Sequence, residues 1–141
     1  MGIVFQDQQR IKVPKRALAQ VAREALRYMD RDPRKCSVTV VLVDNETIKA
    51  YNRRFRGEDA VTDVLAFPGD GNYLGDIIIS VERAREQAPK FGSSLDREMA
   101  LLVIHGVLHL LGYRDYTPDE AREMEGLQEK ILEYVEEKGI I

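Results

Sequence analysis

Apolar positions along the chain follow both of the periods that regular secondary structure imposes on a sequence. After Pro14, apolar side chains are spaced three and four residues apart, which predicts a helix over 15–29 with proline at its favoured first position. Runs of β-branched and apolar residues predict strands, and the four expected ranges are 3–5, 37–43, 61–67 and 75–80. Helices are expected to follow two of these strands, over 45–55 and 81–90. This alternation predicts a layered α/β or α+β fold.

One helix is expected to lie at the centre of the fold. Every residue from Met99 to Leu111 is apolar or glycine except His105 and His109. A helix that is apolar on all sides is typical of a buried position. Residues 93–96 match the capping box that begins such a helix, and Gly112 is the residue type that commonly ends one.

The last predicted helix begins after Thr117 and is strongly acidic. Thr117, Pro118 and Glu120 combine an N-cap residue, a proline at the first helical position and the acid of a capping box. Residues 117–138 contain eight acids and three bases, a charge of −5, whereas the whole chain carries −3. The remainder therefore carries +2, so the net charge neither excludes a polyanionic partner nor argues for one.

His105 and His109 are the only histidines in the chain, and their spacing indicates a metal site. Residues four apart on a helix present their side chains on the same face. Two imidazoles inside an apolar helix are unfavourable unless each has a polar partner, and one metal ion bound by both rings satisfies this requirement. The alternative is a pair of independent histidines with ordinary hydrogen bonds.

Asp115 is the candidate third ligand. The sequence reads His-x-x-x-His-x-x-Gly-x-x-Asp, and Gly112 allows the positive φ that would fold the chain back toward the histidine pair. Three protein ligands leave one coordination position open, which is typical of catalytic rather than structural zinc sites. A metal ion in such a site activates water near neutral pH. The alternative for Asp115 is a turn residue close to the next helix.

Two other functions are open from these residues alone. The histidine spacing is similar to that of metzincin proteases, but those enzymes carry a glutamate directly after the first histidine as the general base. Gly106 occupies that position here, which weakens the hypothesis of a metal-dependent peptidase-like hydrolase. The second is a non-catalytic factor whose metal is structural.

Four ordered segments then link the chain to a known family. They are Tyr51-Asn52-Arg53-Arg54-Phe55-Arg56-Gly57, Thr62-Asp63-Val64-Leu65-Ala66-Phe67-Pro68, Leu74-Gly75-Asp76-Ile77 and His105-Gly106-Val107-Leu108-His109-Leu110-Leu111-Gly112-Tyr113. Together they resemble the YbeY family of bacterial ribosomal RNA maturation factors, which are single-strand-specific, metal-dependent endoribonucleases. The family's motif usually ends in Gly-Tyr-Asp-His. Here it ends in Gly112-Tyr113-Arg114-Asp115, so Asp115 stands where the family has its third histidine ligand.

The resemblance implies a fold, an activity and site residues. The implied fold is α+β, a mixed sheet of about four strands packed with helices, with the metal site on the central buried helix. The implied activity is a hydrolase that cuts phosphodiester bonds of single-stranded RNA. One zinc-type ion (Zn²⁺) would be held by His105, His109 and Asp115, and either water or the ribose 2′-hydroxyl would attack phosphorus. Arg56 matches the family's functional arginine, and a guanidinium binds phosphate through two parallel hydrogen bonds. A surface arginine at a helix end is the alternative.

The resemblance also implies partners: single-stranded ribosomal RNA, and the small ribosomal subunit or its assembly factors, with neither a membrane nor DNA expected. With these partners, the non-catalytic alternative becomes an RNA- or ribosome-binding factor whose metal is structural. Asp115 is a harder ligand than histidine and is anionic. The substitution therefore bears most directly on which metal is bound and on activity. Phe67 and Tyr73 are candidates to stack an unpaired base, with core packing as the alternative for Phe67. Asp63 and Asp76 are candidates to orient a ligand histidine, with turn capping as the alternative.

The composition agrees with a single domain over residues 1–141. Apolar residues make up 44% of the chain and charged residues 32%, which is ordinary for a globular protein. The single cysteine, Cys36, excludes an intramolecular disulfide and a cysteine-rich zinc cluster. No apolar run approaches the ~20 residues of a membrane span, and the N-terminus does not read as a secretory signal. A soluble cytoplasmic protein is therefore expected.

Overall fold

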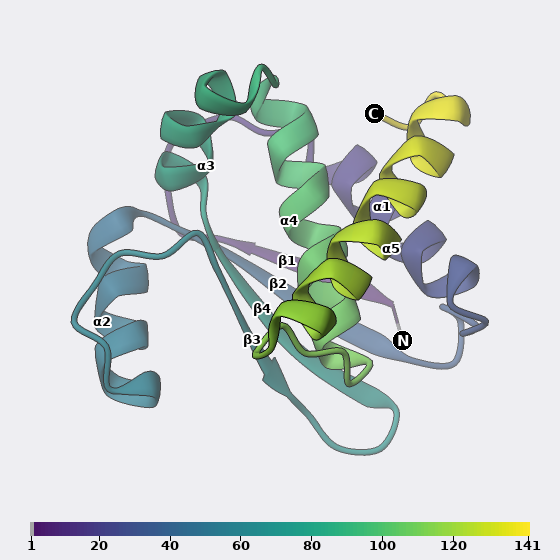
Figure 1. Ribbon diagram of the computed structural model, residues 1–141, viewed down its shortest axis with the longest axis horizontal. Helices are drawn as coiled ribbons and strands as arrows, with labels where there is room; N and C mark the ends of the chain where they lie inside the picture. Colours follow the sequence, from purple (N-terminus) through teal and green to yellow (C-terminus); the bar gives the residue numbers. More distant parts are fainter. Residues whose placement is uncertain (1) are drawn as a thin grey trace.

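The computed structural model describes residues 2–141, and within them helices cover both faces of one sheet (Figure 1). The strands are β1 (Ile3–Asp7), β2 (Ser37–Val43), β3 (Val64–Pro68) and β4 (Tyr73–Ser80). The α-helices are α1 (Lys15–Tyr28), α2 (Asn45–Arg56), α3 (Val81–Gln87), α4 (Leu95–Leu110) and α5 (Pro118–Glu137), and a short 3₁₀-helix (Ala88–Phe91) follows α3. None of the helices in residues 2–141 combines the length and the apolar character needed to cross a lipid bilayer.

The four strands form one mixed sheet in the order β1-β2-β4-β3. β1 pairs with β2, and β2 with β4, in parallel, whereas β3 lies at an edge and runs antiparallel to β4. A tight turn after Pro68 joins the antiparallel pair, as the proline and glycines there predict. The α+β fold with a four-stranded mixed sheet, which the resemblance implies, is confirmed.

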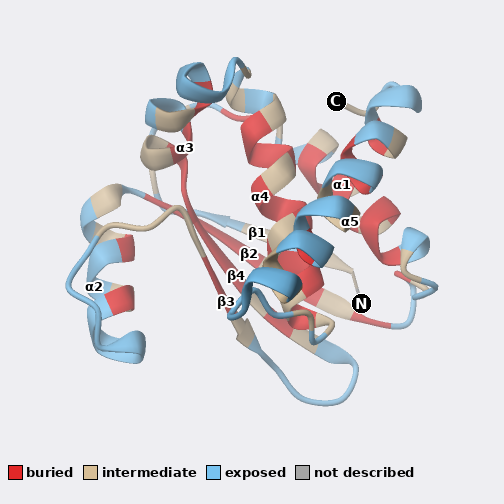
Figure 2. Cartoon of the chain, in the orientation of Figure 1, coloured by how far each residue is buried: buried red, intermediate tan, exposed pale blue. Residues whose placement is uncertain are grey.

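The two faces of the sheet carry cores of unequal size. On one face, α1, α3, α4 and α5 enclose the larger core, in which Leu18, Ile79 and Leu108 are fully buried. On the other face, α2 packs over a smaller core that contains Ile48 and Ile78. Figure 2 shows how deeply α4 lies within the larger core, and ten of its sixteen residues are buried. The buried central helix predicted from the apolar run is therefore present.

The predicted bounds of three strands are wrong. β1 continues to Asp7 instead of ending at residue 5, because Gln6 and Asp7 still pair with β2. β3 begins at Val64 rather than at residue 61, because β4 ends at Ser80 and leaves residues 61–63 no strand with which to pair. One hydrogen bond continues beyond the ladder, from the Ser80 N–H to the Asp63 carbonyl at 2.9 Å. β4 begins two residues earlier than expected, at Tyr73, because the start of β2 pairs with it there.

The end of one helix and the N-cap of another also differ from the prediction. α3 ends at Gln87 and a 3₁₀ turn replaces its expected last residues, because Pro89 has no N–H to donate to an α-helical hydrogen bond. The start of α4 is not a capping box. Ser94 accepts a hydrogen bond from the Arg97 N–H at 3.1 Å, but an arginine at that position supplies no acceptor for the N-cap N–H.

α4 lies very close to the sheet at Gly106. A Cβ atom added to Gly106 would lie 2.6–2.9 Å from three side-chain carbons of Ile77, a fully buried residue of β4. Real Cβ atoms essentially never come so close, so the absence of a side chain is what permits this contact. Position 106 therefore faces the sheet, and the side chain of the preceding His105 is directed elsewhere.

We expect Gly106→Ala to destabilise the protein even though alanine is the better helix former. The gain in helix propensity is about 1 kcal/mol, whereas overpacking against Ile77 costs about 1–3 kcal/mol. Gly126→Ala in α5 is the matched control, because Gly126 is exposed and a Cβ there meets nothing within 4 Å. The control is expected to raise the free energy of unfolding by about 0.5–1 kcal/mol. Denaturant unfolding measures both, and equal stabilisation by the two substitutions would contradict the close packing of α4.

Candidate active site

The last two turns of α4 bring the two histidine rings together. His105 Nε2 and His109 Nε2 are 3.0 Å apart. The rings meet edge to face with their centroids 4.6 Å apart, and only 24% and 22% of the side chains are exposed. The shared helix face predicted from the four-residue spacing is therefore present, and two nitrogen donors point at the same small region.

The chain after α4 returns Asp115 to this pair. Gly112 adopts a φ of 99° and closes a Schellman motif, in which its N–H donates to the His109 carbonyl and the Tyr113 N–H to the Leu108 carbonyl, both at 3.0 Å. The Asp115 Oδ2 atom lies 3.9 Å from His105 Nε2 and 3.7 Å from His109 Nε2. The positive φ predicted at Gly112 thus accompanies the approach of the carboxylate to both rings.

The loop that carries Asp115 is fixed at its far end as well. Thr117 and Glu120 form the predicted capping box of α5, with two reciprocal hydrogen bonds of 3.1 Å. Arg114 turns away from the histidines, pairs with Glu120 at 3.4 Å and lies over the ring of Tyr116. The loop is therefore held between two ordered helix ends, which restricts where the Asp115 carboxylate can lie.

The geometry of the three donors matches a small metal centre. A tetrahedral zinc site with bonds of about 2.05 Å separates its ligand atoms by about 3.3 Å. The three observed separations, 3.0, 3.7 and 3.9 Å, bracket that value, so shifts of a few tenths of an ångström would complete the site. Among residues 2–141, these three side chains are the only group of three or more potential metal ligands with such close donor atoms.

Gln128 of α5 contacts His105 from the other side. Its side-chain oxygen lies within hydrogen-bonding distance of His105 Nδ1. An amide oxygen can only accept, so Nδ1–H donates and the lone pair of the neutral ring is left on Nε2, toward Asp115. Gln128 could not be predicted from the sequence, because nothing in its position along the acidic helix indicates which residue of α4 it meets.

The environment favours a neutral His109 ring. Burial lowers the pKa of His109 below its ordinary value of 6.5, and the neighbouring His105 lowers it further. The Asp115 charge and a hydrogen bond to the Tyr113 backbone oppose this shift, whereas the Arg56 charge adds to it. A neutral imidazole is the form that binds a metal ion.

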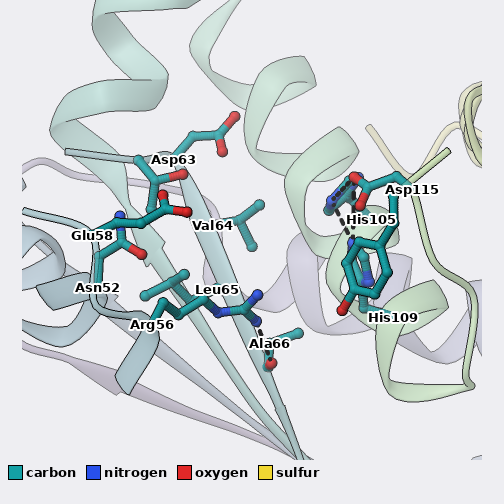
Figure 3. A pocket seen from close by; sticks show the side chains of 12 residues that line it. Asn52, Arg56, Glu58, Asp63, Val64, Leu65, Ala66, His105, His109 and Asp115 are labelled. Atoms are coloured by element: carbon teal, nitrogen blue, oxygen red, sulfur yellow. Dashed lines mark hydrogen bonds and ion pairs between the residues drawn. The ribbon is translucent and has the colours of Figure 1, made fainter. Parts of the chain in front are cut away.

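Arg56 lies in the same cavity as the histidines. This cavity of about 300 Å³ extends from the His105–His109–Asp115 group across β3 to the end of α2. Figure 3 shows the guanidinium reaching over β3 toward the histidines, and its Nη2 donates to the Ala66 carbonyl at 3.3 Å. The structure therefore brings together all four residues that the sequence singled out.

Asn52 and Gly57 hold the end of α2 that carries Arg56. Gly57 ends the helix with a φ of 71°, and the buried Asn52 donates from Nδ2 to the Ala60 carbonyl at 3.0 Å. The loop that follows α2 is thereby tied to the helix. Asn52 and Glu58 also line the cavity, which the sequence analysis did not predict.

Asp63 and Asp76 do not orient either histidine through a hydrogen bond within residues 2–141. Asp63 lines the cavity, but its carboxylate accepts from Gln87 Nε2 at 2.9 Å, and the same amide donates to the buried Glu98 at 3.0 Å. Asp76 accepts from the Tyr73 hydroxyl and lines a different hollow. The side chain that contacts the His105 ring nitrogen Nδ1 is that of Gln128.

Comparisons with known proteins agree with the resemblance that the four segments indicate. The sequence model of one family, Endoribonuclease YbeY, matches residues 3–136. A Brevibacillus brevis protein of that name is 48% identical over 117 residues, which cover 70% of this chain and 74% of that protein. Another from Carboxydothermus hydrogenoformans is 41% identical over 129 residues, which cover 89% and 90%.

The fold has a solved counterpart. A Thermotoga maritima protein determined in solution is 31% identical and superposes with a TM-score of 0.67, over 94% of this chain and 88% of that one. The family expected from the four sequence segments is thus found by the family model and by the named relatives, and the solved structure supports the fold. The chain belongs to the YbeY family of endoribonucleases.

Proposed function

We propose that the protein is a metal-dependent endoribonuclease that cuts single-stranded RNA during ribosomal RNA processing, and that His105, His109 and Asp115 hold its metal ion. The observation that carries this proposal is the convergence of three donor atoms in a cavity that also contains a guanidinium. The names of the relatives support an RNA substrate. The same proposal extends to the substrate, the partners and the location. The substrate is ribosomal RNA, the partners are the small ribosomal subunit or its assembly factors, and the place of action is the cytoplasm.

The donor set of two imidazoles and one carboxylate suits a zinc-type ion. When bound, the ion supplies a Lewis acid that polarises the phosphate and activates the nucleophile. Gln128 holds the His105 ring so that Nε2 offers its lone pair, and the two ends of the Asp115 loop hold the carboxylate opposite. Asp115 also makes the site one charge less positive than a three-histidine site would be.

Arg56 binds the phosphate on the far side of the cavity. Its hydrogen bond to the Ala66 carbonyl uses one N–H and leaves others of the guanidinium's five free to contact phosphate oxygens. A fixed positive charge at this place stabilises the negative charge that develops on the phosphate as the bond to the leaving oxygen breaks. Hydrolysis and attack by the 2′-hydroxyl both benefit from it.

The packing of Gly106 argues against a peptidase. In metzincin proteases the residue after the first histidine is a glutamate that acts as the general base. Here that position lies against Ile77 in the core and has no room even for a methyl group without a shift. A carboxylate could not reach the cavity from there.

A purely structural metal is also disfavoured. Closed structural zinc sites use four protein ligands, whereas only three donors converge in the part of the chain that the structure describes. The remaining direction opens into the cavity shared with Arg56. That arrangement leaves room for a substrate next to the ion.

The proposal predicts that labelled, unpaired RNA is cut by metal-loaded protein and that an unstructured peptide is not. We expect His109→Ala to lose both bound metal and cleavage. Arg56→Ala should keep the metal and reduce kcat by about 100-fold or more, as when a single charge-stabilising donor is removed. Arg85→Ala on α3 is the control, because it removes a guanidinium outside the cavity.

Metal content and cleavage are measured on the same samples, with a chelator added to one portion. Full cleavage by His109→Ala protein, or by chelated wild type, would refute the assignment of the metal site. Intact RNA after incubation with metal-loaded wild type would refute the nuclease and favour the RNA-binding factor.

Gln128→Leu should weaken metal binding by about 10- to 100-fold, because it removes the acceptor that fixes the His105 tautomer. Glu129→Leu is the matched control, since Glu129 is the next residue and is exposed. Competition with a chromophoric chelator gives the zinc dissociation constant of each variant, and thermal unfolding verifies the fold. A dissociation constant in Gln128→Leu equal to that of the control would show that Gln128 does not position His105.

A further inference from the structure

A second hollow lies on the other face of the sheet, beside α2. It has a volume of about 470 Å³, within the range of about 300–1,000 Å³ that is usual for ligand sites. Its walls combine four aromatic side chains with polar groups and an apolar floor. The lining residues that matter here are Tyr51, Phe55, Phe67, Tyr73, Thr39 and Asp76.

The aromatic rings of this groove are unusually accessible. Phe55 is 55% exposed and Tyr73 37% exposed, so neither ring serves mainly to fill the core. Phe55 packs edge to face on Phe67 with centroids 5.4 Å apart, and Tyr51 stacks on Phe55 at 5.9 Å. Rings held in place by one another but open on one side are a platform on which a flat ligand can stack.

Arg56 joins this groove to the candidate active site. Ala66 and Phe67 are neighbours on edge strand β3, so their side chains point to opposite faces of the sheet. Ala66 lines the cavity with the histidines, and Phe67 lines the aromatic groove. The Arg56 guanidinium donates to the Ala66 carbonyl and also lies 5.9 Å from the centre of the Phe67 ring. An RNA strand that crosses the free edge of β3 beside Arg56 would pass from one hollow directly into the other.

The charges around the groove suit a nucleotide whose base is inside and whose phosphates are outside. Arg54 lies over the Phe55 ring at 5.3 Å, and neither Arg54 nor Arg56 forms an ion pair within residues 2–141. These guanidiniums border the groove, where phosphates of a polynucleotide would run. Inside it, the Tyr73 hydroxyl donates to Asp76 and lies 2.9 Å from the Thr39 hydroxyl, which gives base edges polar groups to contact.

We propose that this groove is a base-binding subsite, in which one or two unpaired bases next to the scissile phosphate stack on Phe55, Phe67 and Tyr73. The inference rests on the proposed function, because it assigns the groove to the same RNA strand that the metal site would cut. A stacking subsite explains physically why the proposed nuclease would prefer unpaired RNA. Bases held in a duplex are already stacked and cannot turn their faces to the protein. Phe67 and Tyr73 would then stack a base. For Phe67 this is the stacking role considered from the sequence, in place of the alternative of core packing.

The test uses short unpaired RNAs in which 2-aminopurine replaces each base near the cut in turn. Stacking on an aromatic ring quenches its fluorescence, which is read on mixing with metal-loaded protein before cleavage proceeds. We expect quenching at one or two consecutive positions beside the cut. Phe55→Leu, which removes an exposed ring but keeps an apolar side chain, should weaken binding about tenfold and raise KM about tenfold, with a smaller change in kcat.

Phe91→Leu is the control, because Phe91 is 71% exposed and lies outside the groove. An RNA with an abasic nucleotide at the quenched position gives a second check. For this abasic RNA, the KM of Phe55→Leu should equal the KM of wild type, because the RNA no longer carries the base that stacks on Phe55.

The outcomes separate this inference from the proposed function. Normal cleavage with no difference between Phe55→Leu and wild type would overturn the subsite, give the groove to another occupant such as a protein partner, and leave the nuclease intact. Equal losses in Phe55→Leu and Phe91→Leu would also overturn it. Base-specific quenching that needs Phe55, in a wild type that cuts no RNA, would support the subsite and refute the nuclease.

Discussion

The close contact between Gly106 of α4 and Ile77 of β4 is the constraint on which the site depends. It fixes how α4 is rotated about its axis, because only a residue without a side chain fits at the point of contact. With position 106 turned toward the sheet, His105 and His109 project to the side, toward edge strand β3 and the end of α2. The same contact leaves no place for the glutamate that a peptidase would carry there.

Burying the two histidine rings costs free energy unless each has a polar partner, so their burial indicates that such a partner binds there. Two nitrogens that face each other at 3.0 Å in a largely apolar helix can share one proton between them, or both can bind one ion. Burial and the neighbouring His105 lower the pKa of His109, which favours the neutral ring that can bind a metal ion at the candidate site. Gln128 and the Asp115 loop then determine where the lone pairs converge.

Much of the fold could be predicted, because periodic apolar patterns report directly on burial. The apolar run around His105 predicted the central helix, and Gly112 predicted the turn that returns Asp115. The boundaries that failed depend on partners distant in sequence. β3 starts at Val64 only because β4 stops at Ser80, which no local pattern near residue 61 contains.

The site was predictable to the same extent and for the same reason. His105, His109 and Asp115 follow one another along the chain, so their spacing alone brought them together. Arg56 needed the family resemblance, because its approach to the histidines is made by the sheet and not by local sequence. Gln128 was missed, since its contact with His105 depends on how α5 crosses α4. The proximity of the aromatic groove to the candidate active site likewise appears only when β3 is seen as an edge strand with one face toward each hollow.

The proposed activity depends on a metal ion held by His105, His109 and Asp115. X-ray absorption spectroscopy on zinc-loaded protein tests this most directly, because it identifies the ligand atoms themselves. We expect two imidazole nitrogens and otherwise oxygen ligands at about 2.0–2.2 Å, with the imidazole signal reduced to one ring in His109→Ala. A spectrum with fewer than two imidazoles in the wild type, or with a sulfur ligand at about 2.3 Å from Cys36, would contradict it.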